Sequence, residues 1–98
     1  MMRFSYEEHV DPGSVAVDMK WVDGEREGEV HLPDAMRQVL LDSDYPLPDG
    51  VQRLEFAVSY GVCVALLSRK ALRLTGDPTV WDPAWGALHF PQGLPVDG

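Results

Sequence analysis

The hydrophobic pattern of the chain centres on residues 54–67, a stretch with one charged residue in fourteen. We therefore expect this stretch to form the centre of the core. Its pattern is compatible with two periods. Alternate residues from Leu54 to Leu66 are apolar, which is typical of a strand. Val64, Leu67, Ala71 and Leu74 instead follow a helical stripe.

Chain length limits the choice between these two periods. Fourteen strand residues would span roughly 45 Å, whereas a globule of this size has a radius of gyration of roughly 13 Å. The stretch must therefore bend or change from strand to helix, and Gly61 is the natural place for this change. We predict a strand over residues 53–60 and favour a helix over 62–75, which the sequence Gly76-Asp77-Pro78 would end. The alternative is a strand over 62–67 and a second one over 71–75, although the turn between them would lack Gly, Asn, Asp and Pro.

The clearest local pattern is a β-hairpin over residues 15–32. Apolar and polar residues alternate up to Asp23-Gly24, a favoured two-residue hairpin turn. This turn sets a register that places the apolar residues of both strands on one face, as a stable hairpin requires. A longer loop ending at Gly28 would shift the register and stays open as an alternative. In the first register, acidic residues line the outer face and the tip: Asp18, Asp23, Glu25, Glu27 and Glu29.

The remaining segments complete an α+β fold. Pro33-Asp34 is typical of a helix start, and the pattern predicts a helix over residues 34–42. Short strands are expected near both ends of the chain. We therefore expect one α+β domain over residues 1–90, in which a small antiparallel sheet packs against one or two helices. Residues 91–98 are rich in Pro and Gly, which predicts an extended tail.

Charge is distributed unevenly along the chain. Of the net charge of −8, all lies in residues 1–49, which hold twelve acidic and four basic residues. Direct binding to nucleic acid is disfavoured, because phosphate contacts need a basic surface. The acidic half is either a solvated surface or a surface for a basic partner. The chain contains no Ile and no Asn, and Arg outnumbers Lys six to two, which indicates a GC-rich genome, bacterial or phage.

Several features bear on the cellular compartment. A single cysteine excludes an intramolecular disulfide and is typical of a reducing compartment. The chain has neither an apolar segment long enough for a membrane helix nor an apolar signal core at its start. We therefore expect a cytoplasmic protein with no membrane partner.

Residues with catalytic or metal-binding potential show no informative spacing. His9, His31 and His89 are far apart in the sequence, and Cys63 has no partner cysteine, so we expect no metal and no cofactor. Cys63 lies among Val and Ala, and we interpret it as a core residue. No catalytic residues are predicted, and the pattern favours a protein that is not an enzyme.

Trp81 and Trp85 lie on a Pro-containing loop and have two interpretations. They close the open end of a small core, or they present a rigid aromatic surface to a partner. From charge and size we expect a small acidic interaction module of the inhibitor, immunity-protein, antitoxin or nucleic-acid-mimic type. Its partner-binding residues would be Asp23, Glu25, Glu27, Glu29, Trp81 and Trp85. The alternatives are a self-assembling homo-oligomer that uses the tryptophan loop, for example a phage component, and a small-ligand binder or enzyme that uses Cys63, His31 or His89.

Overall fold

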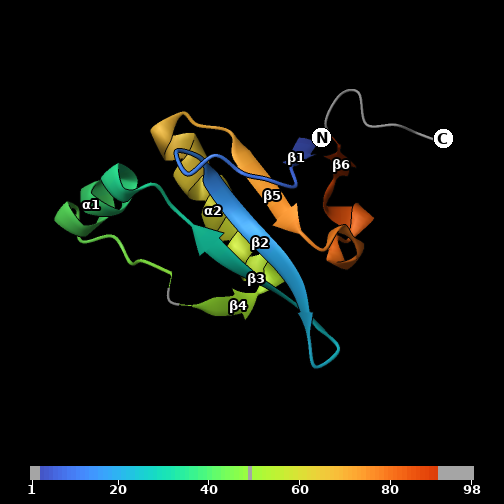
Figure 1. The fold of residues 1–98 in the computed structure, drawn as a ribbon. Helices are drawn as coiled ribbons and strands as arrows, with labels where there is room; N and C mark the ends of the chain where they lie inside the picture. Colours follow the sequence, from blue (N-terminus) through green and yellow to red (C-terminus); the bar gives the residue numbers. More distant parts are fainter. Residues whose placement is uncertain (1–2, 49, 91–98) are drawn as a thin grey trace.

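The computed structural model describes residues 3–48 and 50–90, and it shows an α+β fold with a six-stranded mixed sheet and two helices (Figure 1). The α+β class is confirmed, but the sheet is larger than predicted and is not purely antiparallel. The elements are β1 Arg3–Tyr6, β2 Val15–Val22, β3 Glu25–His31, α1 Asp34–Asp42, β4 Val51–Arg53, α2 Leu54–Ser68, β5 Leu72–Gly76, the short 3₁₀ turns η1 Pro78–Val80 and η2 Pro83–Trp85, and β6 Ala87–His89.

The strand order is β4-β3-β2-β5-β1-β6. The predicted hairpin and its two-residue turn are confirmed, with Val17 opposite Val30, Met19 opposite Gly28 and Lys20 opposite Glu27. β4 adds to this hairpin in antiparallel orientation. On the other side β5 pairs with β2 in parallel, β1 pairs with β5, and β6 pairs with β1, all in parallel. The hairpin and β4 therefore form one half of the sheet, and β5, β1 and β6 form the other half.

The central apolar stretch forms one helix, α2, so the strand predicted over residues 53–60 is wrong. The size of the domain excludes a single long strand but not a single helix, because fifteen helical residues span only about 22 Å. The alternation from Leu54 to Leu66 carries little information on the period, because half of the intervening residues, Ala57, Cys63 and Ala65, are apolar too. An apolar run of this length is more typical of a buried helix than of a strand.

Two glycines allow α2 to lie close to the sheet. A Cβ on Gly28 of β3 would lie 2.8 Å from Leu54 Cδ1 and 2.9 Å from Val17 Cγ1. A Cβ on Gly61 would lie 2.9 Å from Leu72 Cδ1. Gly61 is therefore a packing residue in the middle of the helix and not the break that we predicted.

The helix predicted over residues 62–75 is correct only as far as Ser68, where α2 ends. Arg69 adopts a left-handed conformation with φ 58°, and Lys70 N–H donates to Ala65 O at 2.9 Å. The chain then continues as β5, so the turn at residues 68–70 does exist. Arg69 occupies the left-handed position of this turn, where glycine is the usual residue. A turn without glycine was therefore not expected from the sequence.

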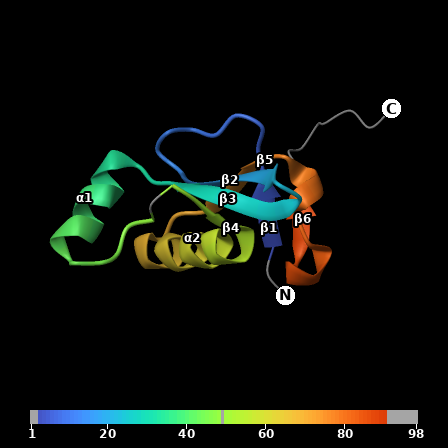
Figure 2. The same ribbon diagram turned by 90° about the horizontal axis from the view of Figure 1, so that it is seen from below.

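α2 covers one face of the sheet, and the loop of residues 7–14 lies over part of the other face (Figure 2). The core lies mainly between α2 and the sheet, and η1 adds Val80 to it. The largest fully buried side chains are those of Met19, Leu54, Leu74, Val15, Val17, Val64 and Val80. Within the described residues, no helix is long and apolar enough to cross a membrane. The predicted tail at 91–98 lies outside the described residues.

Candidate functional site

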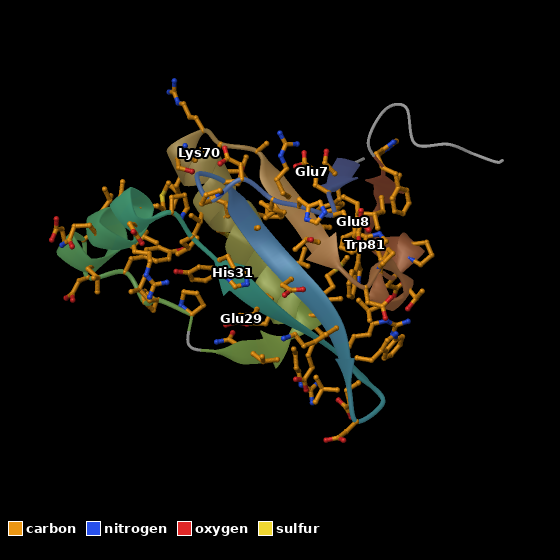
Figure 3. The ribbon with its side chains drawn as sticks, viewed as in Figure 1. Glu7, Glu8, Glu29, His31, Lys70 and Trp81 are labelled. Atoms are coloured by element: carbon orange, nitrogen blue, oxygen red, sulfur yellow. The ribbon has the colours of Figure 1, made fainter. Side chains whose placement is uncertain are left out.

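The sheet face opposite α2 carries most of the acidic residues predicted to bind a partner. Val17 and Gly28 point toward α2, as their closeness to Leu54 requires. Because side chains alternate along a strand, the neighbouring residues point to the opposite side. Asp18, Glu25, Glu27 and Glu29 therefore share one face of the hairpin, which we call the acidic sheet face. Figure 3 shows Glu29 and His31 on the side of the sheet away from α2.

The register shows how these charges are arranged. Glu27 lies between Lys20 of β2 and Arg53 of β4, so both neighbouring strands place a cation beside it. Glu29 lies opposite Asp18, a pair of like charges that strand pairing alone disfavours. Glu25 and Asp23 are exposed at the tip. Negative charge is therefore balanced around Glu27 and unbalanced around Glu29 and at the tip.

A pocket of about 410 Å³ opens at the end of this face, between the loop of residues 7–14 and the sheet. Its polar walls include Asp11, Asp18, Asp34 and His31, and Ala16 lies among its lining residues. No Lys or Arg is among the described residues that line it. The pocket combines three carboxylates with a partly enclosed shape, which suits a cationic group.

Beside the pocket, two side-chain hydroxyl groups link β5 to β1 and to the residues that follow β1. Tyr6 donates its hydroxyl proton to Gly76 O at 2.5 Å, and Thr75 donates to Glu8 O at 3.2 Å. Burial raises the pKa of Tyr6 above its usual value, and the carboxylates of Glu8, Asp77 and Asp18 raise it further. The hydroxyl of Tyr6 therefore lies within the influence of three carboxylates, of which Asp18 belongs to the hairpin.

The two loop tryptophans differ in exposure. Trp81 is only 8% exposed, packs against Phe4 with ring centroids 4.7 Å apart, and donates its indole N–H to Gly86 O at 3.0 Å. Trp85 stacks edge-on against Trp81 and is partly exposed. In this structure Trp81 closes the core, and only Trp85 has side-chain surface available to a partner.

The third tryptophan, Trp21, lies near the turn of the hairpin and is 44% exposed. The guanidinium of its cross-strand neighbour Arg26 lies 5.5 Å from its ring centroid, so the two side chains form a cation–π pair. Trp21 also donates its indole N–H to Thr79 Oγ1 at 3.0 Å. These contacts join the hairpin to η1.

Cys63 was interpreted as a core residue, and this is wrong, because it is exposed on the outer side of α2. The error follows from the wrong boundaries of the helix, since the buried stripe of α2 runs through Ala57, Gly61 and Val64 instead. His31 and His89 lie in register across the sheet, separated by Ala16, Arg73 and Ser5. Among the described residues, no group of His, Cys, Asp and Glu side chains is arranged to hold a metal ion.

The pocket was not predicted from the sequence. Asp11 and Asp34 were interpreted only as turn and helix-start residues, and the crossing of the 7–14 loop over β2 depends on the parallel pairing of β1 with β5. No local pattern signals such a pairing. Comparison of the chain with protein-family models, curated proteins and solved structures finds no match.

Proposed function

We propose that this protein is a small non-enzymatic interaction module whose acidic sheet face binds a basic surface of another protein. The observation that carries the proposal is the shared face of Asp18, Glu25 and Glu29, on the side of the hairpin that α2 leaves free. An acidic surface of this kind speeds encounter with a basic partner and disfavours acidic competitors. Inhibitors, immunity proteins, antitoxins and nucleic-acid mimics use this type of recognition.

The pocket gives the surface a specific anchor. A lysine or arginine side chain of the partner would enter between Asp11, Asp18 and Asp34, and His31 would border it. Charge-assisted hydrogen bonds to carboxylates are stronger than neutral ones, and an arginine side chain can bond to two carboxylate oxygens at once. The flat part of the acidic sheet face would then contribute mainly to the association rate.

Affinity capture from the source cell tests the proposal with charge-reversed variants. The test variant is Glu25→Lys/Glu29→Lys. A lysine at position 29 would lie opposite Asp18, which has the opposite charge, and position 25 lies opposite the uncharged Val22, so neither change places like charges together. Glu27 is left unchanged, since reversal would place three cations side by side. The matched control is Asp42→Lys/Asp44→Lys, which changes the net charge equally at the end of α1.

The proposal predicts that the parent chain and the control capture the same basic protein, which the test variant does not retain. Capture should weaken steeply as salt is raised, because the screening length falls from about 10 Å at 0.1 M to about 3 Å at 1 M. Equal capture by all three chains, or capture that is indifferent to salt, would contradict the proposal.

A further inference from the structure

The outer side of α2 is apolar although the sheet covers only its other side. Phe56, Leu66 and Leu67 are 53%, 70% and 69% exposed. Glu55 is the one charged residue between Leu54 and Ser68. A helix that is hydrophobic all round is normally buried on all sides. We call Phe56, Ser59, Cys63, Leu66 and Leu67 the outer face of α2.

Grooves lie on both sides of this outer face. One groove, of about 380 Å³, is lined by Val58, Val62, Cys63 and Trp85 among others. The other groove, of about 440 Å³, lies between α1 and the end of α2 and is lined by residues that include Met36, Val39, Tyr45, Val64 and Leu67. The outer face is therefore a ridge between two apolar grooves, the form in which helices pack against one another.

The charges at the two ends of α2 indicate that its outer face binds a second copy of this chain. Glu55 lies in the first turn, and Arg69 and Lys70 follow the last turn, all three exposed. In an antiparallel pair of α2 helices, each Glu55 would lie beside Arg69 and Lys70 of the other copy. A parallel pair would instead place like charges together. Between these ends, the outer face carries no charge that would repel another copy of this acidic chain.

The apolar contacts fit the same arrangement. If Glu55 meets Arg69 of the second copy, the two-fold axis passes close to Val62. The same axis brings Phe56 to Leu67 of the second copy, beside the groove that α1 borders. The small side chains of Ser59 and Cys63 lie near the axis, where two helices must approach to about 8–10 Å. Contacts of this kind are self-complementary, as a two-fold interface requires.

We infer that this protein forms a homodimer in which two α2 helices pack antiparallel through their outer faces. A stable interface buries about 800 Å² on each partner, which is more than one short helix face offers. The interface must therefore extend to Val39 of α1, which lines the groove beside α2 and is 58% exposed, and to Trp85 on the other flank. The inference does not depend on the proposed function, because the acidic sheet face lies on the opposite side of the sheet.

Sedimentation equilibrium of the full chain and of Leu67→Glu tests the dimer. Leu67 is 69% exposed, so this change leaves the fold of one chain intact, which circular dichroism verifies. A buried unpaired carboxylate should raise the dissociation constant about 100-fold or more. The matched control is Val51→Glu, the same kind of change at a residue of β4 that is 42% exposed, and it should leave the dimer unchanged.

Charge exchange tests the antiparallel orientation. Glu55→Lys should weaken the dimer, and the added changes Arg69→Glu and Lys70→Glu should restore it, because the pairs act across the two-fold axis. A parent chain that is monomeric at about 100 μM overturns the inference. A dimer that Leu67→Glu does not weaken, or that the charge exchange does not restore, overturns it as well.

Discussion

Gly28 is the position where the packing of α2 on the hairpin can be tested with one methyl group. In the Gly28→Ala variant, the new Cβ would lie 2.8 Å from Leu54 Cδ1, 2.9 Å from Val17 Cγ1 and 3.4 Å from Ala57 Cβ. Leu54, Val17 and Ala57 are all fully buried, so none of them has free space into which it can move. Overpacking of this kind costs about 1–3 kcal/mol.

A second effect acts in the opposite direction. Replacing a strand glycine by alanine lowers the entropy of the unfolded chain and contributes about 0.5–1 kcal/mol of stability. The collision involves two core side chains at once, so we expect overpacking to dominate and the variant to lose about 1–2 kcal/mol. For a domain of this size such a loss lowers Tm by roughly 5–15 °C.

Urea unfolding followed by circular dichroism measures this loss. Glu25→Ala, an exposed change in the same strand, is the control and should stay within about 0.5 kcal/mol of the parent. A Gly28→Ala variant as stable as the parent would show that α2 does not lie against the hairpin at this point.

Three further changes test other parts of the fold. Trp81→Ala should cost about 3–5 kcal/mol because the ring is buried against Phe4; a loss below about 1 kcal/mol in urea unfolding would show that Trp81 is not part of the core. The raised pKa of Tyr6 means that its contribution to stability is complete below pH 10.0 and is lost as the pH rises through the folded pKa. Tyr6→Phe should therefore lose less stability than the parent above pH 10.0, and an equal loss in thermal melts at alkaline pH would refute this. Asp44 has φ 60° after the end of α1, so Asp44→Gly should raise stability by about 0.5 kcal/mol; a destabilised variant in the same melts would contradict the left-handed conformation.

The hairpin could be predicted from the sequence because local chemistry determines it. Asp23-Gly24 fixes the turn, and the alternation around it fixes which side chains face the core. The acidic sheet face follows directly from that register, so its four carboxylates could be placed together from sequence alone. The helix over residues 34–42 was equally well marked, since Pro33 and Asp34 define its start.

α2 and β5 could not be predicted in the same way. The sequence of α2 is mostly apolar, so the contrast between apolar and polar positions is too weak to separate the helical period from the strand period. Gly61 packs against the sheet in the structure, whereas in the sequence a glycine at this position indicates a break. The turn after α2 requires a left-handed Arg69, which local preferences disfavour. These errors also concealed the outer face of α2, because Cys63 and Leu67 were assigned to the wrong side of the element.

We propose two separate binding faces, the acidic sheet face for a basic partner and the outer face of α2 for a second copy. The most direct test is amide NMR of the full chain titrated with a short lysine- and arginine-rich peptide. We expect shift changes concentrated at Asp18, Glu29, Thr75 and the pocket, with α2 unaffected. Changes spread evenly over all exposed acidic residues, including Asp42 and Asp44, or changes centred on α2, would contradict it.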